Sequence, residues 1–345
     1  MAESIDRTEQ GTQGEGTLGG FTREKILAEL ESKGYVVIPG VVPRDECDKC
    51  IAEYKAWLAK FDEHGIEFKQ RRSVIQSYRV GHFAPSWRVR LKAKTVFARV
   101  WGTEKLLSSI DGIAISQPPE KEGGEFRRER QDWLHLDQGA QRNGLHAYQG
   151  AVYLEEQTKD DYCFRVLEKS HKYHSEFFET FPRAIQKTAR CEFYKMDVTE
   201  KKFYYDKGAE LKYVPVPKGG IVLWDSRTVH DNNPPARERT DPNRWRFVVF
   251  VSMTPAQWAS NDDIRFKKDV YRNMNLTAHW SSQGQTTFKP YNPKYRKRGQ
   301  DEVSIQYLPP EGRTKEAKQL AGMEPYDFYD DEPNGPDPPI WRSES

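Results

Sequence analysis

The sequence predicts a mainly β protein with flanking helices (α+β) whose core is a double-stranded β-helix of the jelly-roll, cupin-like type. Between residues 133 and 256, short β-rich segments such as HAYQGAVYLEE and RWRFVVFVSMTP follow one another, and turn residues separate most of them. Many short strands with glycine and proline between them are typical of a barrel or sandwich. A length of 345 residues allows one large domain with a substantial core.

The N-terminal part combines a tail with helices and a strand. Residues 1–20 are rich in Gly, Glu, Thr and Gln and have almost nothing to bury, which predicts a disordered tail. Helical spacing of apolar residues predicts a helix with a glycine stop over 22–34. The segment YVVIPGVV predicts a buried strand that begins at residue 35 and ends at Pro39-Gly40. A second helix is expected over 43–61, because proline suits a first helical turn.

Residues 21–308, which include these N-terminal elements, are expected to form one domain. Its jelly-roll strands are expected at about 130–256. The pattern of residues 96–116 predicts helix, turn, helix and strand, and a surface loop should follow. We expect further helical stretches over 174–189 and after Ser260. Residues 309–345 end in a Pro/Asp/Glu-rich sequence and are predicted to be an extended or flexible tail.

Composition excludes several classes of protein. Lys+Arg at 54 and Asp+Glu at 52 give a formal net charge of +2, which argues against a protein built around a phosphate-binding face, so no nucleic-acid partner is expected. No apolar run approaches the roughly 20 residues that span a bilayer. The N-terminus lacks the apolar region of a secretory signal, so we expect a cytoplasmic protein. Cys47 and Cys50 form a lone C-x-x-C that we interpret as reduced thiols.

The candidate metal ligands start with His135 and Asp137 in the segment WLHLDQ. Residues two apart on a strand share a face, so both side chains can point at one ion. His230 ends the segment GGIVLWDSRTVH, which reads as a glycine turn followed by a buried strand, and it is the best third ligand. Two histidines and one carboxylate leave positions open for oxygen and a chelating co-substrate, which favours iron(II) over zinc.

A basic residue follows on the next β-rich segment. Arg246 opens RFVVFVSM, and an arginine fork matches a carboxylate with two hydrogen bonds and keeps its charge when partly buried. Arg246 is therefore predicted to hold the distal carboxylate of 2-oxoglutarate. Arg244 has the same strand parity and is the competing choice, but it follows Asp241-Pro242-Asn243 and is expected to belong to the turn.

Two further polar residues are candidate contacts to the co-substrate. Gln149 shares one face of its segment with Ala151 and Tyr153, and it would contact the co-substrate or substrate, or else form a cross-strand hydrogen bond. Asn232 lies two residues past His230 and could also contact 2-oxoglutarate.

Taken together, these segments resemble the phytanoyl-CoA dioxygenase family of iron(II)- and 2-oxoglutarate-dependent oxygenases. The resemblance runs from about residue 34 to 255, with its core in WLHLDQ, QGAVYLEE, VLEKSHK, GGIVLWDSRTVH and RFVVFVSMTP. It implies a double-stranded β-helix with His135, Asp137 and His230 as the iron ligands and Arg246 as the co-substrate anchor. The chain departs from the family at Asp161-Tyr162-Cys163 and Glu168-Lys169-Ser170-His171, where the family commonly has a Gly-Gly turn and a Pro-Gly-Ser-His element.

The resemblance also implies an activity. It predicts a dioxygenase that uses iron(II), 2-oxoglutarate and O₂ to hydroxylate or desaturate a small organic substrate, with release of succinate and CO₂. Related halogenases have Gly or Ala in place of the carboxylate, so Asp137 favours hydroxylation over halogenation. The alternatives are a catalytically inactive jelly-roll domain that binds a small molecule or partner, and a metal-dependent isomerase or hydrolase of cupin type.

Overall fold

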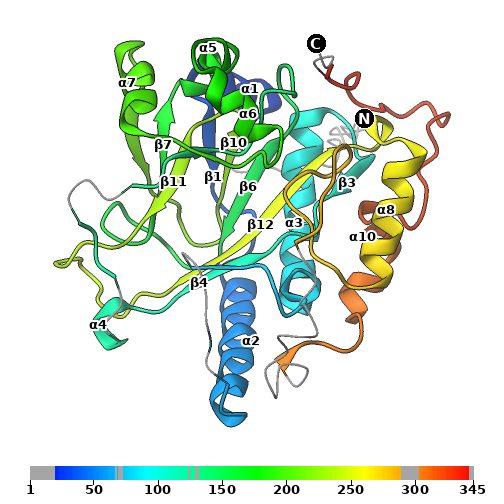
Figure 1. Ribbon diagram of the computed structural model, residues 1–345. Helices are drawn as coiled ribbons and strands as arrows, with labels where there is room; N and C mark the ends of the chain where they lie inside the picture. The colour runs from blue at the N-terminus through cyan, green and yellow to red at the C-terminus, as the bar shows by residue number, and fades with distance from the viewer. Residues whose placement is uncertain are drawn as a thin grey trace, which may run out of the picture.

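The structure is a computed structural model that describes residues 20–66, 68, 73–122, 125–128, 132–288 and 303–341. It confirms the predicted fold class, a jelly roll of antiparallel sheets with helices packed around it (Figure 1). The predicted N-terminal tail lies outside the described residues except for Gly20. The described residues contain no helix that is long and apolar enough to span a membrane.

The larger sheet has seven strands. Its order is β1-β10-β6-β12-β4-β2, and β3 pairs with the far end of β12. The bounds of these strands are β1 Tyr35–Ile38, β2 Val74–Ile75, β3 Leu106–Ser108, β4 Ile113–Ser116, β6 Tyr148–Tyr153, β10 Ile221–Asp225 and β12 Arg246–Pro255. The sheet thus includes four strands, β1 to β4, that precede residue 130, where we placed the first jelly-roll strands.

The smaller sheet has five strands in the order β8-β5-β11-β7-β9. Its strands are β5 His135–Leu136, β7 Cys163–Glu168, β8 Tyr194–Lys195, β9 Glu210–Val214 and β11 His230–Asn233. Side chains that face the larger sheet form a buried apolar cluster with it, which includes Phe164, Val166, Trp224 and Val248. Because side chains alternate along a strand, every second residue points into the interior between the two sheets. Polar residues at such positions are candidates for a functional site.

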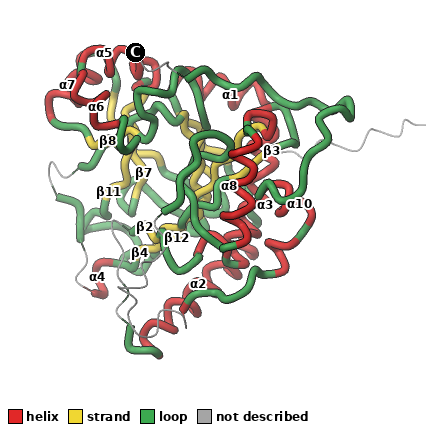
Figure 2. Tube along the Cα trace, turned by 45° about the vertical axis from the view of Figure 1, so that its right-hand side comes forward, coloured by secondary structure: helices red, strands yellow, loops and turns green. Residues whose placement is uncertain are grey.

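Helices cover the outer face of the larger sheet. They are α1 Arg23–Lys33, α2 Arg44–Glu63, η1 Val80–His82, α3 Ala84–Trp101, η3 Ala256–Trp258, α8 Asn261–Arg272, η5 Pro310–Arg313 and α10 Lys315–Leu320. Figure 2 shows α2, α3, α8 and α10 together on one side of the strands. Their apolar faces and the outward side chains of the sheet form the largest core cluster. As predicted, α1 ends at Gly34, whose φ of 91° suits a glycine.

A second group of helices covers one end of the smaller sheet. It consists of η2 Ser170–Tyr173, α5 His174–Thr180, α6 Pro182–Thr188 and α7 Val198–Asp206, with a separate apolar cluster beneath them. A further short helix, α4 Pro119–Glu122, lies in the predicted surface loop. Helix α7 was not expected from the sequence; it begins with a capping box in which Asp197 and Glu200 satisfy each other's backbone N–H groups.

One predicted element is wrong. The second helix expected within residues 96–116 is instead strand β3, whose three residues are all buried. Leu106, Leu107 and Ser108 pair with Pro255, Thr254 and Met253 of β12. Apolar residues that are buried on both faces lack the alternation of a half-exposed strand, and long-range pairing decides their conformation.

The C-terminal segment is docked along its described length. Trp258 Nε1 donates to Pro336 O at 2.7 Å, and Lys105 Nζ donates to Glu332 O at 3.1 Å. Near its end, Trp341 forms a β-bridge with Arg142. Helix α10 and these contacts hold the segment, red in Figure 1, against the domain.

Candidate metal centre

The smaller sheet brings the three predicted ligands together. His135 on β5 and His230 on β11 are cross-strand partners, and Asp137 follows β5 directly. One ligand atom from each of the three residues lies within 4.8 Å of the other two. The Asp137 carboxylate lies between the rings, with Oδ1 3.5 Å from His135 Nε2 and Oδ2 3.5 Å from His230 Nε2. Two imidazole nitrogens and a carboxylate at these distances fit a divalent transition metal.

Backbone carbonyls orient both imidazole rings. His135 Nδ1 lies 3.2 Å from Trp133 O, and His230 Nδ1 lies 2.9 Å from Thr228 O. A carbonyl accepts from a protonated Nδ1, and in that tautomer Nε2 carries the lone pair that binds a metal. Burial alone would raise the pKa of Asp137, but the neighbouring His135 and His230 lower that pKa below its usual range. The carboxylate is therefore ionised, as metal binding requires.

Aromatic rings enclose the ligand histidines. The His135 ring is stacked on Trp133, with centroids 4.5 Å apart, and the Phe193 ring lies 4.7 Å from His135. The His230 ring lies 5.1 Å from Trp224 and 5.7 Å from Phe164. These contacts restrict the orientation of both rings and limit the access of water.

Asp231, between His230 and Asn232, fixes the position of the strands. Its carboxylate accepts hydrogen bonds from Arg165 Nε and Nη2 at 2.8 and 2.7 Å, and from Trp133 N at 3.0 Å. Removal of one partner from a buried, bidentate ion pair strongly destabilises the folded protein, because the other charge is left buried and unpaired. The hydrogen bonds of the Asp231 carboxylate therefore hold β7, β11 and the residues before β5 together around the metal ligands.

Arg246 lies in the interior between the sheets with unsatisfied donors. It is 3% exposed, and its Nε and Nη1 have no hydrogen-bond partner among the described residues. The guanidinium carbon is 6.0 Å from the centre of the Tyr153 ring, and the Tyr153 hydroxyl approaches it without a hydrogen bond of ordinary geometry. Ser116, its cross-strand partner, has a hydroxyl that likewise finds no partner within the described ranges. Buried donors of this kind require an acceptor, and a carboxylate matches them.

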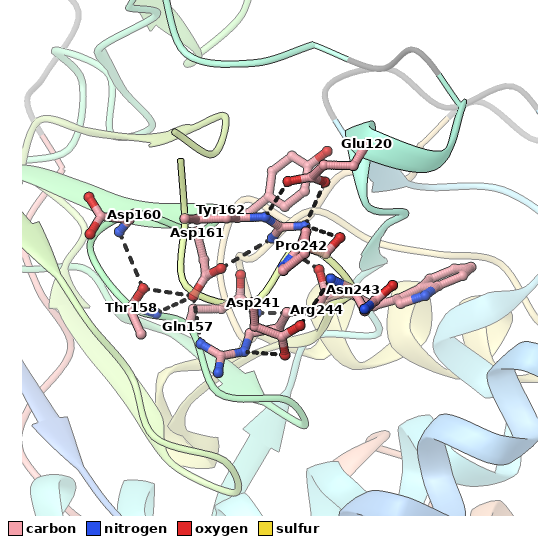
Figure 3. Close-up of polar contacts among 12 residues, drawn as sticks. Glu120, Gln157, Thr158, Asp160, Asp161, Tyr162, Asp241, Pro242, Asn243 and Arg244 are labelled. Atoms are coloured by element: carbon pink, nitrogen blue, oxygen red, sulfur yellow. Dashed lines mark hydrogen bonds and ion pairs between the residues drawn. The ribbon is translucent and has the colours of Figure 1, made fainter. Parts of the chain in front are cut away.

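Arg244 is held elsewhere. It precedes β12, and its Nη1 donates to Asp161 Oδ2 at 2.8 Å. Asp161 also accepts from Arg239 Nη1 and from the backbone and hydroxyl of Thr158 (Figure 3). Arg239 in turn binds Glu120 through Nε and Nη2. Arg244 thus closes a charge network beside the loop before β7, whereas Nε and Nη1 of Arg246 have no acceptor in the described part of the chain.

Gln149 and Asn232 differ in their surroundings. Gln149 is buried on β6, opposite Trp224 and Ser252, and its Nε2 has no partner among the described residues. The nitrogen Nε1 of Trp224 is likewise unpartnered there. Asn232 donates from Nδ2 to Tyr162 O at 3.3 Å, and its backbone carbonyl accepts from Trp133 Nε1 at 2.8 Å.

One residue near the ligands was missed from the sequence. His279 lies close enough to Asp137 and His230 for their charges to interact, and its Nε2 is buried without a partner among the described residues. Burial lowers the pKa of His279 to about 4, so the ring is neutral at neutral pH. It follows helix α8 in a region without strand or helix pattern, and no motif marks it.

Comparisons with known proteins find a family and several proteins to which this chain is similar. A family model described as phytanoyl-CoA dioxygenase (PhyH) matches residues 30–234. "Ava biosynthesis cluster protein O" of Aspergillus versicolor is 26% identical over 282 residues, which cover 74% of this chain and 86% of that protein. The crystal structure of GlcNAc Inducible Gene 2 (GIG2) from Candida albicans is similar with a TM-score of 0.57 at 15% identity, covering 89% of this chain and 78% of that one. HygX from Streptomyces hygroscopicus, solved with nickel and 2-oxoglutarate bound, has a TM-score of 0.42 at 18% identity, covering 68% and 88%.

Proposed function

Because this chain belongs to the phytanoyl-CoA dioxygenase family, whose members are 2-oxoglutarate-dependent non-haem iron oxygenases, we propose that it hydroxylates or desaturates a small organic substrate. Succinate and CO₂ would be the co-products. We assign His135, Asp137 and His230 as the iron ligands and Arg246 as the residue that binds the distal carboxylate of 2-oxoglutarate. The observation that carries the proposal is the pairing of a three-ligand cluster with a buried arginine whose Nε and Nη1 lack an acceptor among the described residues.

Each ligand has a definite task in this proposal. When bound, iron(II) and 2-oxoglutarate would supply the electrons that activate O₂, which is the oxidant of the C–H bond. His135 and His230 present Nε2 because their Nδ1 atoms face backbone carbonyls. Asp137 contributes one negative charge, so a divalent ion in this site keeps a net positive charge that favours a dicarboxylate. The side chain of Asp137 is 17% exposed, which leaves an approach for the other reactants.

Arg246 would orient the co-substrate from the opposite wall. Its fork can donate two parallel hydrogen bonds to a carboxylate, and the hydroxyls of Tyr153 and Ser116 can add further donors. Gln149, with an unpartnered amide nitrogen in the same interior, is proposed as a contact to the co-substrate or substrate. For Asn232, whose amide is already bonded to Tyr162 O, we propose a smaller role at the edge of the co-substrate site.

The test is anaerobic addition of iron(II) and 2-oxoglutarate to the full chain. A visible charge-transfer band of the iron chelate should appear, and admission of oxygen should produce succinate. Asp137→Ala, which removes a ligand, should abolish both signals. If the wild-type protein gives neither the band nor oxygen-dependent succinate, the proposal fails and a catalytically inactive small-molecule-binding domain becomes the better description.

A further inference from the structure

A hairpin that follows helix α8 lies beside the metal centre. Residues 276–288 form it, with Ala278 N donating to Thr286 O at 3.0 Å and Phe288 N donating to Leu276 O at 3.1 Å. Ser281 Oγ donates to Ser252 O at 2.8 Å, and Ser252 is the cross-strand partner of Gln149. The hairpin therefore lies at the end of the larger sheet where a candidate co-substrate contact is found.

This hairpin carries His279, which has an unused hydrogen-bonding atom. His279 is only partly exposed, and its Nε2 is buried without a partner among the described residues. A neutral imidazole has one donor and one acceptor, and burying either without a partner is unfavourable. His279 is near Asp137 and His230 but is not one of the three clustered ligand residues. The atoms that cover Nε2 must move aside before a group bound beside the metal can supply the missing partner.

The loop before β8 carries an exposed aromatic ring. Phe193 is 43% exposed although its ring lies 4.7 Å from that of the ligand His135. An exposed phenyl ring beside a metal ligand offers an apolar surface on which a flat ring can stack. It lies just before β8, on the loop that follows α6.

The loop that carries Phe193 and the hairpin that carries His279 are in direct contact. Glu192, adjacent to Phe193, accepts a hydrogen bond from Arg142 Nε at 2.7 Å and another from Trp280, adjacent to His279. The Arg142 guanidinium lies 3.5 Å from the centre of the Trp280 ring and 4.3 Å from that of Trp341. These contacts fix the spacing between the Phe193 loop and the His279 hairpin, so both side chains can act on one molecule.

We propose that Phe193 and His279 form the substrate seat, and that the substrate has a flat apolar ring bearing a hydroxyl or amide group. The ring lies on Phe193, and the polar group hydrogen-bonds to His279 beside the metal. This inference rests on the proposed function and adds the chemical class of the substrate. It makes His279 a specificity-determining residue that takes no part in holding the metal or 2-oxoglutarate.

Two probes of nearly the same shape test the seat without knowledge of the substrate. Phenol and toluene are added separately to the full chain loaded with Mn(II) and 2-oxoglutarate, and the Mn(II)-dependent broadening of their ring-proton NMR signals is titrated, with Zn(II) as the diamagnetic control. We expect phenol to bind about five-fold more tightly than toluene, the value of one hydrogen bond. His279→Ala should remove this preference, and His279→Gln, which keeps a donor and an acceptor, should restore part of it.

Phe193→Ala should lower the affinity for phenol and for toluene by the same factor, roughly two- to ten-fold. The reason is that the ring contact is lost while the hydrogen bond to phenol remains. The matched controls are His64→Ala and Tyr205→Ala, which remove an exposed imidazole and an exposed ring elsewhere and should change neither affinity. An unchanged phenol preference in His279→Ala, equal affinities in the wild type, or no Mn(II)-dependent broadening would each overturn the seat. A normal chelate band from the same protein loaded with iron(II) and 2-oxoglutarate in place of Mn(II) would show that the proposed function stands regardless, whereas a missing band would overturn both.

Discussion

Replacement of Arg246 separates a co-substrate anchor from a structural arginine. The substitutions are Arg246→Lys, which keeps the charge and loses the fork, and Arg246→Gln, which loses both. If Arg246 binds the distal carboxylate, both variants should bind 2-oxoglutarate more weakly than the wild type. If instead the residue only stabilises the interior, they should change stability and leave 2-oxoglutarate affinity unaltered.

The size of the effect follows from the unsatisfied donors. Two nitrogens of Arg246, Nε and Nη1, await an acceptor, and a hydrogen bond to a charged group contributes about 1.5–3 kcal/mol. Loss of one such bond in Arg246→Lys should raise the Kd for 2-oxoglutarate by roughly 10- to 150-fold. Arg246→Gln should raise it further. In the protein without 2-oxoglutarate, Arg246→Gln should leave stability equal or higher, because an unpaired buried charge is removed.

The assay is an anaerobic titration of the chelate band with 2-oxoglutarate, accompanied by thermal unfolding of the protein without it. Arg244→Lys is the matched control, since Arg244 binds Asp161 and should contribute nothing to the Kd. A Kd within two-fold of wild type for Arg246→Lys would refute the reasoning. A large rise for Arg244→Lys instead would move the anchor to that residue.

Three further predictions concern the ligand set, the hairpin and a buried lysine. Asp137→Ala should raise the Kd for Mn(II) at least about 100-fold, measured from the EPR signal of free Mn(II), because a charged ligand is lost; unchanged affinity would exclude Asp137 as a ligand. Gly284→Ala should lower the free energy of unfolding by about 1–3 kcal/mol in denaturant titrations, since φ is +61° and a Cβ would lie 2.5 Å from Arg142 Nη2. Gly144→Ala, with φ +75° and no atom within 4 Å, should cost less, and an equal loss would contradict the steric account. Burial lowers the pKa of Lys267 to about 7, below its unfolded value of roughly 10.4, so the unfolded chain binds more protons in this window and stability should rise with pH from 7 to 10. Lys267→Met should flatten that rise by an amount on the order of a few kcal/mol, and a parallel pH profile would contradict the assignment.

The sequence contained enough information for the parts of the site that depend on strand geometry. His135 and Asp137 could be grouped because strand residues two apart share a face, and His230 because it ends a buried apolar run. The structure places these three together. The choice between Arg244 and Arg246 followed from a turn sequence, and the structure shows Arg244 outside β12.

The remaining features depend on long-range contacts that leave no local pattern. His279 reaches the site because Thr277 N donates to Ile110 O and Ser281 Oγ donates to Ser252 O, and neither bond is visible in a period of apolar residues. Phe193 lies on an irregular loop. Strand β3 was misread as a helix for a related reason, since its conformation is decided by pairing with β12.

The pairing of β1 with β10 has a consequence for the order in which the chain can fold. Tyr35 faces Trp224 and Ile38 faces Ile221, so the first strand of the larger sheet has no partner until residue 225 has been synthesised. Closing so long a loop precedes any gain from the contact, and such non-local sheets fold slowly. A fragment that ends before β10 should therefore expose an unpaired apolar edge and aggregate. For the same reason, we expect the nascent chain to be prone to aggregation through that edge until β10 has been synthesised.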